Sequence, residues 1–391
     1  MELLPYILLA VLAGGFGLVC ERRQSRRLDF AFLLLLTAVM VGMALLRAPQ
    51  VGIDYEFTYK NYFNQTDGQG LAWLTSPANA YKSEPGYGVL NLLVGIFTDS
   101  PLVFAGIASS LIILLRMAWT WKHSSIVWLS VFVYITFDFF GYALCTLRQE
   151  LAISIALFGI PFLQKRKIVP YMLIAVVAGL FHTSLWIMVP IYFLATLPVN
   201  KITLPLYLGG TVCVLLFAEP LVELFIRFVP KYAGYMPGSY FMQGRDFNTA
   251  LIPVIVGALA VVLKGKLLER NPGNIVLINF SVYAGLLFVI TVKHFVFQRV
   301  ALIFLPAAML LIPEMVKCMI RPEWEKEAAD TSGQKYEKRG GSYVRKRDNL
   351  KTAQEMYRLT MGMLMAASVL YFFFLLNTNR LDLVPYLTIF S

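Results

Sequence analysis

Residues 167–201 read KIVPYMLIAVVAGLFHTSLWIMVPIYFLATLPVNK, one apolar run that a His-Thr-Ser triplet at 182–184 interrupts near its middle. A helix rises about 1.5 Å per residue, so roughly 20 residues cross a hydrocarbon layer about 30 Å thick. The run is too long for one crossing, and it ends at a further lysine, Lys201. We therefore predict two short membrane helices with a turn at Phe181–Ser184, and the direction of these helices decides on which side His182 lies.

The amino-acid composition indicates that the whole chain is a membrane protein. Of its 391 residues, 58% are hydrophobic, and the mean hydropathy is +0.66. This apolar excess indicates lipid as the solvent, and the recurring apolar blocks indicate helices rather than the weak alternation of a barrel. Four scattered cysteines show no CxxC or metal-like spacing, so we predict neither a disulfide nor a metal site. The predicted fold class is an all-α polytopic bundle of about twelve spans, forming one integral membrane domain over residues 1–391.

Lysine and arginine clusters mark the cytoplasmic side, because these residues collect in cytoplasmic loops. The clusters are ERRQSRR (21–27), QKRK (164–167), KGKLLER (264–270) and the stretch 317–358. With anionic headgroups as counter-charges, they explain the net charge of +11 without nucleic acid as a partner. We place spans near 3–20, 28–46, 101–120, 126–144, 149–163, 168–181, 183–198, 203–219, 249–264, 273–292, 297–318 and 358–377.

Two further segments complete the predicted topology. Basic residues follow the first apolar run instead of preceding it, so we expect a retained span with an outside N-terminus. The segment GYGVLNLLVGIF (86–97) is too short to cross, and we predict a re-entrant or surface helix on the outer face. Residues 319–356 then form a basic cytoplasmic loop, and His182 lies at the outer surface.

The outer face of this topology carries cations against the positive-inside tendency, which is unusual. Charges near the membrane are costly and are usually functional. These cations are Arg47, Arg148, Lys231, Arg245, Lys293 and Arg299. They predict an anion-handling site at the outer face.

Acidic and aromatic residues on the same face allow two interpretations each. Asp54 is either a general base that also orients a sugar hydroxyl, or the N-cap of a short helix over 55–63. Glu84, just before Pro85 and Gly86, is either functional or a cap. Tyr55 and its neighbours either line a sugar groove or belong to the aromatic belt at the interface.

Arg148 and His182 carry the strongest functional signal. Arg148 lies between two apolar runs beside Gln149; its guanidinium suits phosphate, while the alternative is a salt bridge to Glu150. His182 lies at the break between two short helices, where its near-neutral pKa suits proton transfer or a bond to a diphosphate. The alternative for His182 is a neutral ring satisfied by a helix-end carbonyl. The segment KYAGY (231–235) either holds an anionic glycolipid or lies on the membrane surface as an amphipathic helix.

Several of these segments, in this order, resemble the EpsG family of Wzy-type polysaccharide polymerases. They are RAPQVGIDYEFTYKNYF (47–63), EPGYGVLN (84–91), TLRQELAISIALFGI (146–160), GLFHTSLWIMVPIYFL (179–194) and KYAGY. The resemblance covers most of residues 30–320. It implies a GT-C-like, bacterial inner-membrane glycosyltransferase with its active site facing the periplasm.

The resemblance also implies the reaction and its partners. Such enzymes transfer a growing chain from polyprenyl (undecaprenyl) diphosphate to the end of a lipid-linked repeat unit, building O-antigen, capsule or exopolysaccharide. The implied partners are the undecaprenyl-diphosphate-linked oligosaccharide, membrane lipid and usually a chain-length regulator. The family is thought to need no metal, and we expect no cofactor.

Carried onto this sequence, the resemblance and the outer-face cations give one set of site residues. We assign catalysis to Asp54, as base, to Arg148, which faces the leaving group, and to His182, as a partner of the diphosphate. The expected substrate-binding residues are Arg47, Tyr55, Glu84, Tyr87, Gln149, Ser184, Lys231, Tyr235 and Arg299.

Two other functions remain as alternatives. A flippase of lipid-linked oligosaccharide would carry polar residues along a mid-membrane path and on both faces. A surface-glycan acyltransferase would need a catalytic histidine with a donor channel from the cytoplasm. The polar residues of this chain gather at one face, which favours the polymerase.

Overall fold

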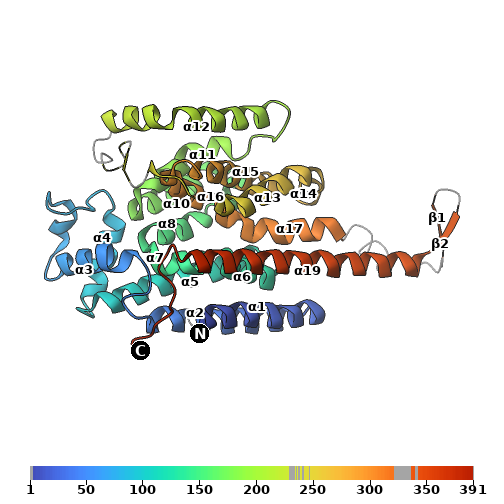
Figure 1. The fold of residues 1–391 in the computed structure, drawn as a ribbon, viewed down its shortest axis with the longest axis horizontal. Helices are drawn as coiled ribbons and strands as arrows, with labels where there is room; N and C mark the ends of the chain where they lie inside the picture. Colours follow the sequence, from blue (N-terminus) through green and yellow to red (C-terminus); the bar gives the residue numbers. More distant parts are fainter. Residues whose placement is uncertain are drawn as a thin grey trace.

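The computed structural model describes residues 3–228, 234, 236, 238–239, 242–245, 247–320, 336–339 and 342–390. Within this part of the chain most residues are helical, and the long helices run roughly parallel to one another (Figure 1). The first half of the chain contains α1 (Leu4–Arg23), α2 (Arg26–Leu46), η1 (Tyr55–Tyr59), α3 (Lys60–Thr66), η2 (Leu71–Thr75), α4 (Pro85–Gly95), α5 (Pro101–His123), α6 (Val127–Thr136), α7 (Phe139–Cys145), α8 (Leu147–Leu157), α9 (Ile160–Gln164), α10 (Ile168–Phe181), η3 (Thr183–Ile187) and α11 (Met188–Leu194). The second half contains α12 (Thr203–Phe228), α13 (Asn248–Val262), α14 (Lys264–Arg270), α15 (Asn274–Thr291), η6 (Phe295–Phe297), α16 (Gln298–Phe304), η7 (Leu305–Ala307), α17 (Ala308–Ile320), the antiparallel strands β1 (Tyr336–Arg339) and β2 (Ser342–Arg345), and α19 (Lys346–Thr378).

Among the described residues, seven helices are long and apolar enough to cross a membrane, and nine spans result if each of two bent pairs counts as one. The chain is therefore a membrane protein, although the predicted twelve spans are not confirmed. The predicted crossings 149–163, 168–181 and 183–198 correspond to α8–α9, α10 and η3–α11, which are shorter helices. Such lengths fall below the roughly 20 residues that a full crossing needs.

The two ends of the bundle differ in content. One end, here the α3–α4 end, carries α3, α4 and the C-terminal residues, whereas the other, the α14 end, carries α14 and the β1–β2 hairpin (Figure 1). The basic clusters 21–27 and 264–270 lie at the α14 end, where the sequence places the cytoplasm. Of the predicted cytoplasmic loop 319–356, residues 321–335 and 340–341 lie outside the described residues.

The apolar segment 167–201 is interrupted by a break in the helix at His182. Helix α10 ends at Phe181, His182 itself is extended (φ −151°, ψ 127°), and η3 begins at the next residue. The two segments meet closely at Gly179, because a Cβ there would lie 2.8 Å from the Trp186 ring. The predicted turn is therefore present, and it lies at the α3–α4 end, where α10 packs against α4.

The core is built by helices from the whole length of the chain. Helices α6, α7 and α8 are almost entirely buried, and α13 packs along α15 through two glycines. A Cβ at Gly257 would lie 2.9 Å from the Ser281 carbonyl oxygen, and one at Gly285 would lie 3.0 Å from that of Pro253. Small residues of this kind let membrane helices approach closely.

Helix α12 stands apart from this core. Only 12% of its apolar window is buried, and its backbone bends at Phe217, near Pro220. One contact to the bundle joins the hydroxyls of Tyr207 and Tyr283 at 3.1 Å. Helix α12 also carries the exposed thiol Cys213; the other three cysteines are buried, and all four are free thiols.

Candidate active site

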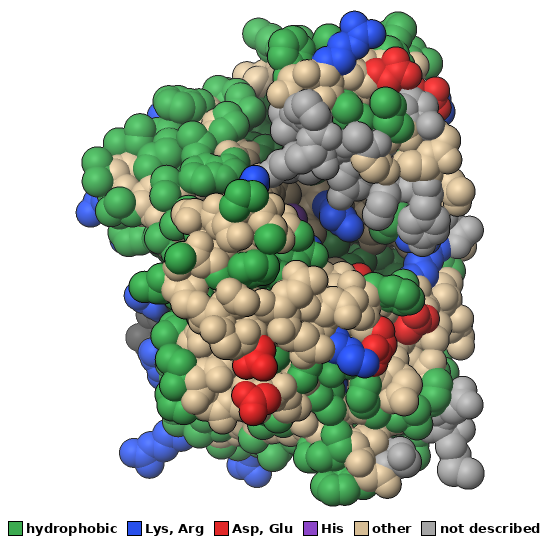
Figure 2. All heavy atoms as spheres, turned by 90° about the vertical axis from the view of Figure 1, so that its left-hand side faces the viewer, with side chains coloured by type: hydrophobic (Ala, Val, Ile, Leu, Met, Phe, Trp, Pro, Cys, Tyr) green, Lys and Arg blue, Asp and Glu red, His purple; other side chains and the backbone are tan. Residues whose placement is uncertain are grey.

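A cavity of about 430 Å³ opens at the α3–α4 end. Figure 2 shows this face of the molecule hollowed near its centre, with basic side chains visible inside the hollow. Its walls come from η1, α7, α8, the α10–η3 junction, the segment before α13, η6–α16 and the end of α19. The polar side chains that line it are Asp54, Thr58, Tyr59, Asp138, Tyr142, Thr146, Arg148, Gln149, His182, Arg245, Thr249, Gln298, Arg299, Thr378, Asn379 and Arg380.

Five of the residues assigned from the sequence share this cavity, although they are far apart along the chain. They are Asp54, Arg148, Gln149, His182 and Arg299. The three residues assigned to catalysis, Asp54, Arg148 and His182, therefore line the same cavity. Arg299 joins this group through the outer-face cation argument alone, because the motifs do not include it.

Asp54 presents a carboxylate to the cavity from the start of η1. It occupies the N-cap position, yet its side chain makes no capping hydrogen bond. Its Oδ2 accepts a long hydrogen bond of 3.5 Å from the Tyr59 hydroxyl. Burial raises the pKa of Asp54 above its usual value, while Arg299 and Arg148 oppose that rise. A carboxylate with a raised pKa next to cations is a suitable general base.

The segment that carries Asp54 is a π-helix, a rare element that often occurs at functional sites. Within it Tyr55 and Tyr59 are buried, whereas the ring of Phe57 lies at the cavity with 83% of its surface exposed. The tyrosines therefore pack the interior side of η1. The exposed aromatic surface of this segment belongs to Phe57, which the sequence analysis did not select.

Arg148 pairs with Glu84, not with Glu150. Its Nη1 lies 2.6 Å from Glu84 Oε2, and its guanidinium stacks 4.0 Å from the ring centre of Tyr81. Glu150 instead pairs with Arg116 at 2.7 Å, deep in the core. Arg148 and Glu150 are two residues apart on α8, so they point to different sides of that helix.

Glu84 connects Arg148 to the His182 break. Its Oε1 accepts hydrogen bonds from the backbone N–H (3.0 Å) and the hydroxyl (2.9 Å) of Thr183. Burial alone would raise the pKa of Glu84, but Arg148, His182 and the bonds from Thr183 hold it below its usual value. Although Glu84 is the N-cap residue of α4, its side chain makes no cap bond there. Its contacts fix the position of two cavity residues.

Hydrogen bonds set the ring orientation of His182. Its Nδ1 accepts the Ser184 backbone N–H at 3.2 Å and lies 2.8 Å from the Ser184 hydroxyl. A ring nitrogen that accepts an N–H bond has no hydrogen of its own, so the neutral ring carries its hydrogen on Nε2. Ser184 thus fixes the orientation of the His182 ring at the cavity.

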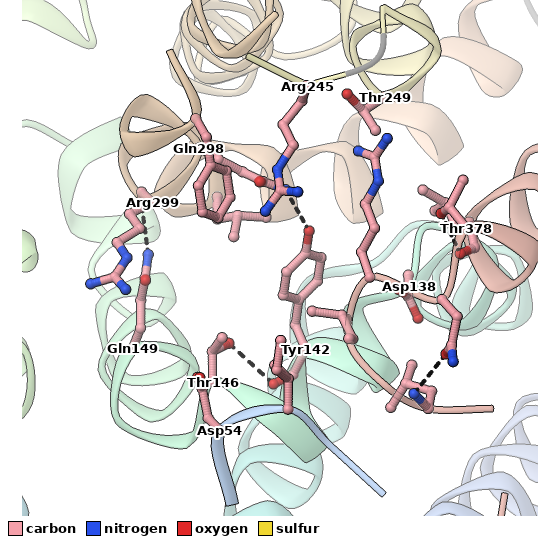
Figure 3. A pocket seen from close by; sticks show the side chains of 18 of the residues that line it. Asp54, Asp138, Tyr142, Thr146, Gln149, Arg245, Thr249, Gln298, Arg299 and Thr378 are labelled. Atoms are coloured by element: carbon pink, nitrogen blue, oxygen red, sulfur yellow. Dashed lines mark hydrogen bonds between the residues drawn. The ribbon is translucent and has the colours of Figure 1, made fainter. Parts of the chain in front are cut away.

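Hydrogen bonds that link α16 to α8 and to α7 fix the wall that carries Arg299. The Gln149 amide donates to the Arg299 carbonyl oxygen, and the Gln298 amide donates to the Tyr142 hydroxyl at 2.8 Å. Figure 3 shows both bonds and the Arg299 side chain beside Gln149. Gln149 therefore contributes by holding the backbone of Arg299.

The other assigned residues that the structure describes lie away from the cavity lining. Arg47 is 1% exposed and donates to the Leu144 carbonyl oxygen, and Tyr55 is buried. Tyr87 is buried too and stacks on Tyr62, with ring centres 5.5 Å apart. Lys231 and Tyr235 lie outside the described residues.

Three charged residues of the cavity were missing from the sequence assignment. Asp138 lies at the 57° bend between α6 and α7 with a left-handed φ of 62°. Arg245 stacks on Phe295 at 3.8 Å and extends into the cavity toward Tyr142 (Figure 3). Arg380 follows the last helix. The sequence carried a signal for each of them. Asp138 is an acidic residue inside an apolar run, and the two arginines are cations at the predicted outer face.

Among the described residues, no three or more His, Cys, Asp or Glu side chains lie close enough together to hold a metal ion. Cationic side chains, in contrast, are abundant at the cavity. Arg148, Arg245, Arg299 and Arg380 all line it. Guanidinium groups bind phosphate oxygens in a bidentate manner, so these side chains suit a phosphorylated ligand.

Comparison with known families supports the same class of protein. A sequence model of the EpsG family matches residues 30–328, which is more than half of the chain. The chain therefore belongs to the EpsG family, as its motifs predicted. Membership makes it a membrane protein of the polysaccharide-polymerase type, in line with its apolar helices. No curated protein and no solved structure matches the chain.

Proposed function

We propose that the chain is a glycosyltransferase that polymerises lipid-linked repeat units at the periplasmic face of a bacterial inner membrane. The donor is a glycan chain on a polyprenyl diphosphate, and the acceptor is a repeat unit on a second carrier. The main support is one observation: the carboxylate of Asp54 shares a cavity with Arg245, Arg299 and Arg380 at one end of a membrane bundle. These groups match a reaction that needs a base for a hydroxyl and cations for a diphosphate.

The proposed step is a single inverting displacement. The acceptor hydroxyl oxygen attacks the anomeric carbon of the sugar that is bound to the diphosphate, while its proton passes to the Asp54 carboxylate. The bond between the anomeric carbon and the diphosphate oxygen breaks, and its electron pair leaves with polyprenyl diphosphate. The products are a chain longer by one unit and a free lipid diphosphate, so no oxidant or further reactant is needed.

Cations of the cavity stabilise the charge that develops on the leaving diphosphate. Arg299 and Arg245 line the cavity from two separate segments, and His182 lines it from the α10–η3 junction. Fixed charges of this type are worth most where charge develops in the transition state. Arg148, through its pair with Glu84, orients the His182 break in this proposal and raises the local positive potential.

The decisive test is a reaction of purified protein in lipid nanodiscs with a defined undecaprenyl-diphosphate-linked repeat unit. We expect a ladder of products that differ by one unit, formed equally in the presence of a chelator. Asp54→Asn protein is the matched negative control. Wild-type protein that leaves the single unit unchanged contradicts the proposal, and loss of the ladder with chelator contradicts its metal-independent form.

In cells, a chain-length regulator is the proposed protein partner, and the same variant separates polymerase from flippase. If the protein polymerises, cells with Asp54→Asn place single repeat units on their surface. If it exports lipid-linked units, those cells place none there. The surface polysaccharide, separated by size, distinguishes the two results.

A further inference from the structure

The C-terminal tail, defined here as residues 379–390, turns back across the α3–α4 end after α19 (Figure 1). It lies outside the stretch 30–328 that the EpsG family matches, and none of the assigned site residues belongs to it. Four of its residues nevertheless line the cavity: Asn379, Arg380, Leu381 and Leu383. The cavity is therefore completed by a segment beyond the family match.

The tail pairs with the loop that leads to Asp54. The backbone N–H groups of Gly52 and Ile53 donate to the carbonyl oxygens of Asp382 (2.9 Å) and Leu381 (3.0 Å). Farther along, Ala48 N–H donates to the Leu387 carbonyl oxygen and Ile389 N–H donates to that of Leu46, each at 2.9 Å. The two residues directly before Asp54 thus bond through their N–H groups to the tail.

The loop at Gly52 has little freedom to adopt another course. Gly52 has a φ of 107°, which side chains rarely allow, and a Cβ there would lie 3.2 Å from the Leu144 carbonyl oxygen. Backbone N–H groups that lose a partner in a buried place cost free energy. Bonds from the tail therefore determine how the loop presents Asp54.

Asn379 sets the course of the tail. It has a left-handed φ of 41°, its Oδ1 accepts the N–H groups of Leu383 and Val384 at 2.9 Å each, and its Nδ2 donates to the Val384 carbonyl oxygen at 2.6 Å. The Tyr6 hydroxyl holds the same turn by donating to the Leu383 carbonyl oxygen at 3.1 Å. One amide side chain thus closes the turn that aligns Leu381 and Asp382 with the loop.

We propose that the C-terminal tail is a positioning element of the active site, which holds the loop 47–53 so that Asp54 faces the acceptor hydroxyl. This inference rests on the proposed function. Asn379 is the residue through which the tail acts, and Arg380 enters the cavity wall as a result of the same turn.

Asn379→Gly tests the contact itself, because glycine keeps the left-handed backbone and removes only the amide. Hydrogen exchange of the peptide over 47–53 is the readout, and it does not depend on activity. We expect faster exchange at Gly52 and Ile53 in Asn379→Gly than in wild-type protein. Asn377→Ala, at an exposed position two residues away, is the matched control and should leave the exchange unchanged.

Kinetics test the effect on the reaction. A displacement of about 1 Å at a reacting group can cost on the order of 100-fold in rate. We expect Asn379→Gly to lower kcat by about 10- to 100-fold while KM for the lipid-linked unit stays within about threefold. Asn379→Asp keeps the oxygen that accepts the N–H groups of Leu383 and Val384, so it should recover most of the lost kcat. A merely structural defect would show no such rescue.

Each result decides for or against the tail. Unchanged exchange in Asn379→Gly, or faster exchange with wild-type kcat, overturns the inference. A higher KM at constant kcat also overturns it, because the tail would then act in binding. Failure of wild-type protein to form a ladder removes the proposed function, whereas the exchange experiment still reports on the contact between tail and loop.

Discussion

At the scale of single residues, the base and the cations of the cavity are coupled. Asp54 is partly buried near Arg299 and Arg148, and burial outweighs these cations, so the pKa of Asp54 is raised. A general base works only when it is ionised. The rate should therefore increase with pH as Asp54 loses its proton, at a pH above the usual 3.8.

Asp54→Asn tests this coupling directly. Loss of a general base typically costs about 10²- to 10⁴-fold in rate, and we expect a loss in this range. The acid limb of the pH–rate profile should disappear with it. Asp67→Asn, at an exposed site after α3, is the control and should keep both rate and profile. An acid limb that persists in Asp54→Asn would assign the base to another residue.

The pair of Glu84 and Arg148 should contribute to stability, because both side chains are largely buried (6% and 17% exposed). Breaking a buried pair by removing one partner costs about 3–5 kcal/mol, so Glu84→Gln should lower the thermal midpoint clearly. Glu56→Gln breaks an exposed pair with Lys60 and should change stability by less than about 1 kcal/mol. Equal thermal midpoints for the two variants would contradict the expectation that the buried pair stabilises the protein more than the exposed pair.

The same pair gives stability a pH dependence of known sign. The pKa of Glu84 is lower in the folded protein than its usual 4.5. The stabilisation is therefore fully present above pH 4.5, and it is lost as the pH falls from there through the folded pKa. Thermal midpoints of wild-type and Glu84→Gln protein should converge over that acidic range, and a constant difference would contradict this assignment.

Sequence reasoning at the residue scale found side chains more reliably than partners. Arg148 and Arg299 were selected because charges at the outer face are costly, and His182 because it lies at a break between two short helices on the same face. The structure brings all three to one cavity. The partner of Arg148 was not predictable from the sequence. Glu84 is 64 positions away along the chain, and only the folding of α4 beside the α10–η3 break brings the two together.

At the scale of elements, the contact of α13 with α15 positions one wall of the cavity. Helix α13 begins directly after the segment of Arg245, and its Thr249 lines the cavity. The backbone N–H of Arg245 donates to the Thr291 carbonyl oxygen at the end of α15, at 3.1 Å. Any change that separates the two helices should therefore move Arg245.

Gly257→Ala is the change that separates them. The added Cβ would lie 2.9 Å from the Ser281 carbonyl oxygen, which is backbone and cannot rotate away. Overpacking of this kind costs about 1–3 kcal/mol, so we expect a lower thermal midpoint and a lower rate of polymerisation. Gly210→Ala on α12, where a Cβ meets nothing within 4 Å, is the control and should lower neither the midpoint nor the rate. A wild-type midpoint in Gly257→Ala would show that the helices can separate at no cost.

Apolar length predicted the position of most elements, and local breaks decided the rest. The short segment 86–97 and the turn at His182 follow from length arguments, and both match the structure as α4 and the α10–η3 junction. The bend inside 126–144 was not predicted. Asp138 takes a left-handed backbone there, and a single residue in that conformation does not change the apolar pattern around it.

At the scale of the whole molecule, the orientation in the membrane is a testable prediction. The basic clusters lie at the α14 end, so the cavity should open on the opposite side of the membrane from the cytoplasm. With Cys213 replaced by serine, Asn64→Cys on α3 should react with an impermeant maleimide in intact cells. Glu269→Cys on α14 should react only after lysis. Reversed labelling would place the cavity in the cytoplasm.

The family and the helical membrane class were predictable, but the number of spans was not. Twelve apolar segments were expected, and in the part of the chain that the structure describes seven to nine spans meet the requirement for length and composition. Apolar composition alone does not distinguish a lipid-crossing helix from a short helix buried among others. Segments such as α8 satisfy their apolar side chains inside the protein, since nearly all of α8 is buried.

The placement of the cysteines offers a spectroscopic use. Cys213 is exposed on the loosely packed α12, while Cys20, Cys145 and Cys318 are shielded by the bundle. A membrane-permeant nitroxide reagent should therefore attach to the natural protein at Cys213 alone, without prior replacement of the other cysteines. Its electron paramagnetic resonance line shape, recorded before and after addition of lipid carrier, would reveal whether the outlying helix swings when a substrate arrives from the bilayer.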